Sequence, residues 1–242
     1  MSRKIKHRVR QLINAAGLEI HRYVPASSRL AQHLAALKTF GIDLVLDVGA
    51  NYGQYAQELR IGGFKGRIVS FEPLLAAHHA LEVASRGDPR WKIHSRCAIG
   101  DREGEIALNV AGNSVSSSVL PMLESHREAA PGSAYVSHEV VPLTTLDNVV
   151  PAYISAQDTP LLKIDTQGYE WAVLDGAFAT LPKIQGVQVE LSALPLYEGQ
   201  HLWQETIARL QGEGFTLWSL QPAFTDHRSG RTLQWDGLFF RQ

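Results

Sequence analysis

A short segment early in the chain places an acid and two glycines where a backbone can close around a small ligand. Asp47 directly follows the apolar run 44–46, and Gly49 and Gly53 come next at a Gly-x-x-x-Gly spacing. Glycines allow a tight turn and a close approach of the backbone to a ligand. The spacing is not that of the Gly-x-Gly-x-x-Gly fingerprint of dinucleotide sites, and the Lys-Ser/Thr ending of a phosphate-binding loop is missing. Because an acid disfavours a pyrophosphate, we expect a ligand that carries an ammonium group.

Acidic residues end four of the predicted strands, and these residues are Asp47, Glu72, Asp165 and Glu190. In an open parallel sheet, ligands bind outside the carboxyl ends of the strands. Buried carboxylates at that edge need a cationic or hydroxyl-bearing partner. Glu72 follows Asp47 by 25 residues, at the end of the next strand, where its carboxylate can accept hydrogen bonds from both hydroxyls of a ribose. The alternative is that the glycines merely pack a helix against a strand.

The elements that must position these residues alternate between apolar runs and helical patterns from residue 41 onward, as βαβ units do. We predict strands at 44–46, 67–71, 91–95, 161–164 and 187–189. We predict helices at 52–59, 169–179 and 201–211, and a further helix that follows Pro73 and ends at about residue 85. The fold class is therefore α/β, with a doubly wound, mostly parallel sheet that is closed by an antiparallel hairpin of residues 216–220 and 233–240. Residues 105–110 extend this sheet or form an edge. Residues 111–139, rich in Ser, Gly and Ala, are predicted to form one long irregular loop over the site.

Six segments of the chain together match one known pattern: Asp47–Tyr55, Phe71–Pro73, Leu146–Asp147, Lys163–Glu170, Pro195–Gly199 and Asp226–Phe240. In these segments, and roughly over residues 42–242, the chain resembles the FkbM family of class I methyltransferases. The block Lys163–Glu170 is much more specific than the glycine loop. The resemblance implies a Rossmann-like fold and transfer of a methyl group from S-adenosylmethionine to an oxygen. In this family the acceptor is commonly a sugar hydroxyl of a glycolipid, a polysaccharide or a macrolide-type natural product.

The resemblance also implies which residues hold the cofactor. The methionine part of S-adenosylmethionine would contact four residues of the glycine loop, namely Asp47, Gly49, Asn51 and Gly53. Glu72 would bind the ribose, and Ala98 and Ile99 would lie near the adenine.

Two carboxylates are the catalytic candidates on the acceptor side. Asp165 is the first candidate for the base that removes the hydroxyl proton, because its strand faces the crevice. Its alternative role is a helix N-cap. Glu190 either holds acceptor hydroxyls or shares a divalent ion with Asp165. Such a pair with water suits magnesium, but the sequence does not establish a ligand set, and we do not favour a metal. Lys163 points to the same face as Asp165 and is expected to pair with it.

A few other residues are weaker candidates for the site. His138 and His201 are alternative bases, although an ordinary surface or packing role is the better expectation for each. Residues 116–118, three serines of the long loop, are candidates for hydrogen bonds to the cofactor or the acceptor.

The composition excludes several classes of protein. The chain has 242 residues, of which 45% are hydrophobic and 19% charged, as in globular proteins. A net charge of −1 argues against a body that binds nucleic acid, which needs a broad basic face. The single cysteine, Cys97, excludes an intrachain disulfide, and no apolar run is long enough to span a bilayer. We expect a cytoplasmic protein.

Residues 1–40 form a basic N-terminal arm that precedes the predicted methyltransferase domain of residues 41–242. Within residues 1–22, six basic residues face a single acid, Glu19, which gives a net charge of +5. Apolar residues recur along one helical stripe, at Ile5, Val9, Leu12, Ile13 and Ala16. The arm is either a terminal helix or tail of the domain, or an interfacial helix that makes peripheral contact with the inner face of an anionic membrane.

Other functions stay open on the sequence alone. An NAD-linked oxidoreductase or epimerase on the same fold would need a third glycine for the pyrophosphate, which this loop lacks. A nucleotide-binding module without catalysis would not need an acid at the end of both later strands. A catechol-type methyltransferase requires a metal and a compact aromatic pocket, whereas the long loop indicates a larger acceptor.

Overall fold

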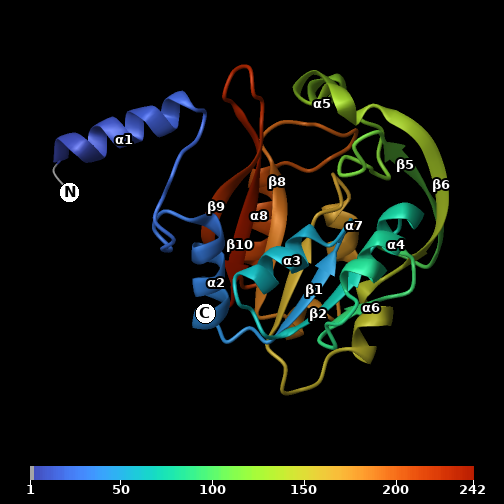
Figure 1. Ribbon diagram of the computed structural model, residues 1–242. Helices are drawn as coiled ribbons and strands as arrows, with labels where there is room; N and C mark the ends of the chain where they lie inside the picture. Colours follow the sequence, from blue (N-terminus) through green and yellow to red (C-terminus); the bar gives the residue numbers. More distant parts are fainter. Residues whose placement is uncertain (1–2) are drawn as a thin grey trace.

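The computed structural model describes residues 3–242, and its centre is a seven-stranded sheet (Figure 1). The strand order is β3-β2-β1-β7-β8-β10-β9. Strand β10 runs antiparallel to both of its neighbours, and the pairs among the other strands are parallel. The predicted doubly wound sheet with an antiparallel closing hairpin is therefore confirmed. The strands are β1 (Leu44–Val48), β2 (Arg67–Phe71), β3 (Trp91–Ile93), β7 (Pro160–Ile164), β8 (Gly186–Ser192), β9 (Thr216–Thr225) and β10 (Thr232–Phe240).

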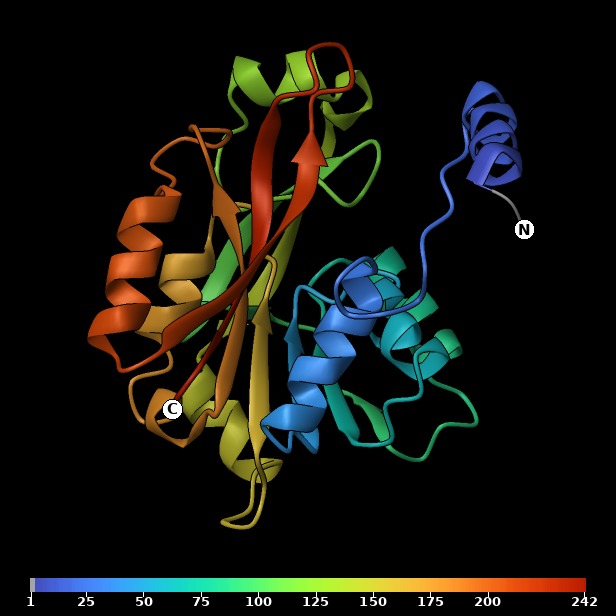
Figure 2. The same cartoon turned by 90° about the vertical axis from the view of Figure 1, so that its left-hand side faces the viewer.

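Helices cover both faces of the sheet, as the two views in Figures 1 and 2 show. One face packs against α2 (Arg29–Thr39), α3 (Gln54–Ile61) and α4 (Leu75–Ala84). The other packs against α6 (Leu146–Val149), α7 (Glu170–Asp175) and α8 (Trp203–Gly212). Each face has its own apolar cluster because successive side chains of a strand point to opposite faces. Three short 3₁₀ helices complete these connections, at Pro131–Ser133, Val150–Ala152 and Leu181–Lys183.

On the face covered by α2 and α3, the strands change from apolar to polar toward their carboxyl ends. Four residues that lie side by side on adjacent strands form a polar row across this face. They are Ser70 on β2, Asp47 on β1, Lys163 on β7 and Gln188 on β8. One step earlier on the same face, Val45 and Leu161 are fully buried in the apolar cluster. The sheet therefore delivers polar side chains to one edge, while the rest of this face forms core.

A second, three-stranded sheet holds residues that were predicted differently. Its order is β4-β6-β5, with β4 at Ala98–Ile99, β5 at Gly104–Ala111 and β6 at Tyr135–Thr144. The prediction that residues 105–110 extend or edge the main sheet is wrong, because β5 pairs with β6 alone. The predicted irregular stretch 111–139 is also too long, since it contains α5 (Glu124–Ala129) and the start of β6. Valines at 136, 140 and 141 favour this strand.

Helix α7 is shorter than the predicted helix 169–179, and Gly176 explains why. A Cβ atom at Gly176 would lie 1.9 Å from the carbonyl oxygen of Gly100, so the chain needs a glycine for this close approach. The helix ends at Asp175, and Gly176 packs against the backbone of Gly100, which follows β4.

The predicted arm contains two helices with different surroundings. In α2, Ala36 and Leu37 are buried in the core. Helix α1 (Arg3–Ala15) lies to the side of the sheet domain in both views (Figures 1 and 2). No helix in the part of the chain that the structure describes is long and apolar enough to cross a membrane.

Candidate functional site

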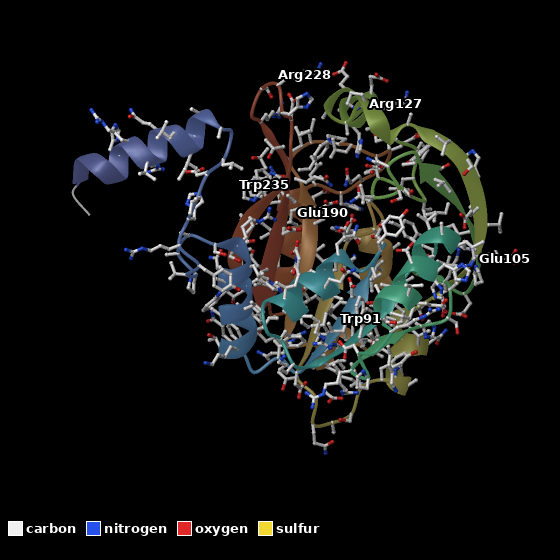
Figure 3. The ribbon with its side chains drawn as sticks, in the orientation of Figure 1. Trp91, Glu105, Arg127, Glu190, Arg228 and Trp235 are labelled. Carbon is white, nitrogen blue, oxygen red and sulfur yellow. The ribbon has the colours of Figure 1, made fainter. Side chains whose placement is uncertain are left out.

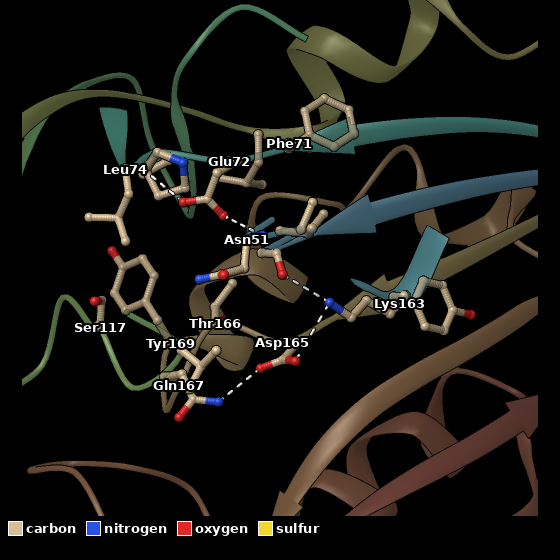
Figure 4. Close-up of a pocket in the computed structure, with 18 of the residues that line it drawn as sticks. Asn51, Phe71, Glu72, Leu74, Ser117, Lys163, Asp165, Thr166, Gln167 and Tyr169 are labelled. Atoms are coloured by element: carbon tan, nitrogen blue, oxygen red, sulfur yellow. Dashed lines mark hydrogen bonds and ion pairs between the residues drawn. The ribbon is translucent and has the colours of Figure 1, made fainter. Parts of the chain in front are cut away.

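A cavity of about 340 Å³ opens at the carboxyl edge of the sheet (Figure 4). Its volume lies within the range of small-molecule sites. Its walls come from the β1–α3 loop, the ends of β2 and β7, strands β4 and β10, and the loop over residues 114–119. Six of the predicted site residues line it, namely Gly49, Asn51, Glu72, Ala98, Ile99 and Asp165. The predicted residues Asp47, Gly53 and Glu190 are not part of this lining, and each lies close behind it.

Both glycines of the β1–α3 loop adopt a left-handed backbone, but they serve different purposes. Gly49 has φ 75°, and a Cβ atom there would lie 1.8 Å from the carbonyl oxygen of Asp165. The loop therefore packs directly on the end of β7. Gly53 has φ 83° and begins α3, where a Cβ atom would lie 2.7 Å from the Trp91 ring. Gly49 is thus a cavity residue, whereas Gly53 lets the helix turn toward the sheet.

Glu72 connects the two loops of the predicted cofactor side. Its Oε2 accepts a hydrogen bond from the backbone N–H of Asn51 at 2.7 Å, and its Oε1 accepts one from Leu74 N–H at 2.8 Å. Burial raises the pKa of Glu72 to about 7, although both N–H donors act in the opposite direction. Each carboxylate oxygen keeps a further lone pair for a ligand hydroxyl. The side chain is fixed in place at the end of β2, as Figure 4 shows.

Lys163 lies between the carboxylates of Asp47 and Asp165. Its Nζ is 3.1 Å from Asp47 Oδ1 and 3.6 Å from Asp165 Oδ2, and it donates a hydrogen bond to the Gly49 carbonyl at 2.9 Å. Burial alone would lower the pKa of Lys163, but the two carboxylates raise it above its ordinary value. Asp47 is fully buried and also accepts a hydrogen bond from Ser70 Oγ. The expected ion pair between Lys163 and Asp165 is present, and the Lys163 ammonium pairs with Asp47 as well.

Gln167 connects Asp165, Glu190 and Tyr197, and the sequence alone did not single it out. Its backbone is left-handed, with φ 55°. Its Nε2 donates to Asp165 Oδ1 and to Glu190 Oε2, both at 2.9 Å. Its Oε1 accepts a hydrogen bond from the Tyr197 hydroxyl at 2.8 Å. A non-glycine residue in this conformation is uncommon and often belongs to a functional site. The signal in the sequence was its position inside the most specific block, Lys163–Glu170.

Glu190 lies one layer behind the cavity, near the end of β8 (Figure 3). Its Oε2 also accepts a hydrogen bond from Gln234 Nε2 at 2.6 Å. Burial, and then the nearby charges of Asp165 and Glu170, raise the pKa of Glu190 well above its ordinary value. This environment favours the protonated form. Asp165 differs, because its side chain is 40% exposed, lines the cavity and has a cationic partner.

Glu170 closes a turn through backbone hydrogen bonds. Its Oε1 accepts hydrogen bonds from the N–H groups of Thr166 and Gly168. Burial raises its pKa to about 7. The side chain closes the turn between β7 and α7.

An ion pair at the side of the cavity joins two segments that were not predicted to meet there. Arg29, the first residue of α2, places its Nη2 2.9 Å from Asp236 Oδ2 on β10, and both residues line the cavity. Burial and the charge of Asp165 raise the pKa of Asp236 to about 6. An acid within the mostly apolar strand Thr232–Phe240 was the signal for Asp236. No pattern in the sequence indicated Arg29.

The weaker candidates mostly lie elsewhere. His138 is exposed on β6, and His201 stacks on Trp171 with ring centroids 3.6 Å apart, so neither lines the cavity. Ser117 does line it, and its Oγ accepts a hydrogen bond from Ala111 N–H. Ser118 Oγ donates to the Gln167 carbonyl. The serines thus support the loop over the cavity.

The lining suits a ligand with an apolar ring system at one end and polar groups at the other. Phe71, Ala98 and Ile99 provide apolar surface beside Glu72. Toward β8, Gln188 Oε1 is buried in the described structure without a hydrogen-bond partner, which leaves one acceptor for a ligand donor. In the range 3–242, no group of three or more His, Cys, Asp or Glu side chains has the arrangement of a metal site.

The fold resembles those of several solved structures. A protein from Thermobifida fusca assigned as a methyltransferase has a TM-score of 0.51 at 12% identity, over 88% of this chain and 79% of that one. Magnesium protoporphyrin IX methyltransferase from Synechocystis PCC 6803 has a TM-score of 0.46 at 11% identity, over 88% and 78%. Aeropyrum pernix fibrillarin has a TM-score of 0.46 at 11% identity, over 86% and 74%. At 12% identity, the Thermobifida fusca structure supports the fold and nothing further.

The comparison of sequences identifies the family. No curated protein matches the chain. The model of the methyltransferase FkbM domain matches residues 47–217, which is more than half of the chain and includes the glycine loop, Glu72, Asp165 and Gln167. The protein therefore belongs to the FkbM methyltransferases, a family of class I enzymes whose cofactor is S-adenosylmethionine.

Proposed function

We propose that this methyltransferase transfers the methyl group to a hydroxyl oxygen of a sugar-containing acceptor. The observation that carries the proposal is Asp165. It is a carboxylate at the cavity wall, fixed by Lys163 on one oxygen and by Gln167 on the other. A hydroxyl is a poor nucleophile until a base takes its proton, and this position suits such a base.

The cofactor side of the cavity fits the donor. Glu72 would accept hydrogen bonds from the ribose hydroxyls, and Ala98 and Ile99 would pack beside the adenine. The methionine part would lie along the loop that contains Gly49 and Asn51. When bound, S-adenosylmethionine supplies a methyl group that is already activated as a sulfonium. The remaining tasks of the protein are to position the acceptor and to remove a proton.

Asp165 is the preferred base over Glu190. A base must be ionised at the working pH and within hydrogen-bond reach of the acceptor. Glu190 lies in surroundings that favour its protonated form and is separated from the cavity by Gln167. We infer that Asp165 accepts the proton from the acceptor oxygen as that oxygen gains the methyl group. Glu190 then holds Gln167 in place.

The side of the cavity near Asp165 favours an acceptor rich in hydroxyl groups. Its lining includes charged and amide side chains that can donate or accept hydrogen bonds, namely Arg29, Gln167, Gln188 and Asp236. A catechol-type site would instead need a metal and an aromatic lining. None of the five tryptophans lines the cavity, whereas Tyr55, Phe71 and Tyr169 do, so the acceptor panel below includes a catechol.

The test is methyl transfer from labelled S-adenosylmethionine to a panel of acceptors. The panel contains simple glycosides, glycolipids, a catechol and a primary amine, and the products are located by mass spectrometry. We expect label on a sugar oxygen, and on glycosides in preference to the catechol and the amine. Transfer to nitrogen, or cofactor binding without transfer to any acceptor, would contradict the proposal.

A further inference from the structure

The first helix has an apolar stripe that is bordered by arginines. On a helix with 3.6 residues per turn, Val9, Leu12 and Ile13 fall within an arc of roughly 100°. Arg8 and Arg10 lie on either side of this arc. Such an arrangement places apolar side chains and cations on neighbouring parts of one surface.

Most of this stripe is open to solvent in the described chain, although Ile13 is half-buried. Leu12 is 72% exposed and Val9 42% exposed. The hydrogen bonds and ion pairs that the structure describes for residues 7–24 stay within the segment up to Ser28, including the Arg10–Glu19 pair. In both views the helix lies away from the sheet domain (Figures 1 and 2). A helix with a polar and an apolar side gains its stability mainly by burying the apolar side.

The segment that follows α1 also exposes large apolar side chains. Leu18, Ile20, Tyr23 and Val24 are all exposed. Together with Val9 and Leu12, these make six of the sixteen large exposed apolar side chains in the described residues, all within residues 9–24. A soluble surface normally scatters such residues singly, whereas a concentration of them marks an interaction site.

The charge of the segment identifies what covers it. Residues 1–22 carry a net charge of +5, while the rest of the chain carries −6. A purely electrostatic partner such as a nucleic acid would use the arginines but would leave the apolar stripe exposed to water. An anionic lipid surface accommodates both, because the apolar side enters the boundary of the acyl chains and the arginines meet the headgroups.

We propose that residues 3–24, here called the docking segment, bind the surface of an anionic membrane. The helix lies in the plane of the surface, with Val9, Leu12 and Ile13 in the lipid and Arg8 and Arg10 at the headgroups. None of the residues in the docking segment lines the cavity, so binding to the membrane does not depend on which acceptor is methylated.

The experiment measures co-sedimentation of the full-length protein with vesicles of phosphatidylcholine, with and without phosphatidylglycerol. We expect binding to the anionic vesicles that weakens as salt is added. Val9→Ser with Leu12→Ser is expected to lower the partition constant by roughly tenfold or more, since two buried apolar side chains are lost. Arg8→Gln with Arg10→Gln is expected to lower it about fivefold per arginine on anionic vesicles.

The matched control replaces exposed apolar residues outside the segment. Ile61→Ser with Phe178→Ser removes side chains that are 82% and 87% exposed, and vesicle binding is expected to stay unchanged. Cofactor binding, measured by calorimetry, should be equal in all variants and shows that each is folded. Equal vesicle binding by the wild type and both docking-segment variants would overturn the proposal. The proposal would also be overturned if the protein bound RNA more tightly than vesicles and if Val9→Ser with Leu12→Ser left the binding to vesicles unchanged.

Discussion

The two sides of the cavity are built in different ways. The side proposed for the cofactor, around Gly49, Asn51 and Glu72, consists largely of backbone, and the Glu72 carboxylate is held by two backbone N–H groups. The side proposed for the acceptor, around Asp165 and Gln167, consists of side chains that hold one another through ion pairs and amide hydrogen bonds. Backbone contacts fix a site regardless of most substitutions, whereas a side-chain network can be altered one residue at a time. Binding of the cofactor and turnover should therefore be separable by mutation.

The largest effect is expected at Asp165. Asp165→Asn keeps the size of the side chain but removes the base, so methyl transfer should fall by roughly 10²–10⁴. The dissociation constant for S-adenosylmethionine should change little, because the cofactor side is untouched. The control Asp175→Asn removes an acid that pairs with Arg209 outside the cavity and should leave kcat unchanged. If Asp165→Asn retains full transfer, the two sides are not separable in this way and Asp165 is only structural.

The next largest effect is expected at Glu72. Glu72→Ala removes the hydrogen-bond acceptor for the ribose and leaves Asn51 N–H and Leu74 N–H without their partner. Cofactor binding measured by calorimetry should weaken by about 1–3 kcal/mol. Glu82→Ala, which changes an exposed acid of α4, is the control and should bind the cofactor normally. An unchanged affinity in Glu72→Ala would place the ribose elsewhere.

A smaller effect is expected from pH. The folded-state pKa of Glu72 is about 7, above its ordinary value of 4.5, so the side chain takes up a proton as the pH falls through 7. A protonated carboxyl accepts fewer hydrogen bonds from the ribose, so cofactor affinity should fall below pH 7, by at most about tenfold per pH unit. The same raised pKa means that ionising Glu72 costs stability, and this cost grows between pH 4.5 and 7. Glu72→Gln should bind more weakly at pH 8 and show a flatter pH profile. A steep profile in Glu72→Gln would assign the effect to another group, such as Asp236.

No effect is expected from chelation. The Lys163 ammonium lies 3.6 Å from Asp165 Oδ2 and would repel a divalent ion bound to that carboxylate. The rate of methyl transfer should be the same without additions, with excess EDTA, and after magnesium is added to the EDTA-treated enzyme. Loss of activity in EDTA and its recovery with magnesium would show that Asp165 and Glu190 hold an ion instead.

The sequence predicted more of the cavity residues on the side proposed for the cofactor than on the side proposed for the acceptor, for a physical reason. Gly49, Asn51 and Glu72 belong to one βαβ unit, so short spacings along the chain place them together. Arg29 and Asp236 meet across 207 residues, and no local pattern reports such a contact.

Asp47 and Gly53 illustrate a second limit of the sequence. Their types and spacing were recognisable, but a spacing does not tell which side chain faces the ligand and which supports the residue that does. In the fold, Asp47 is paired with Lys163 and Gly53 packs against Trp91. The roles predicted for them toward the methionine part stay predictions.

The ion pair between Arg29 and Asp236 has a consequence for how such enzymes diversify. Both residues line the cavity, and both lie outside residues 47–217, the range that the family model matches, although Asp236 belongs to the segment Asp226–Phe240 that resembles the family. A change at this pair alters one wall of the cavity and leaves the matched range intact. Because strand β10 also carries core residues such as Phe239, replacing the pair itself, and not the whole strand, is the change that we expect to alter acceptor preference.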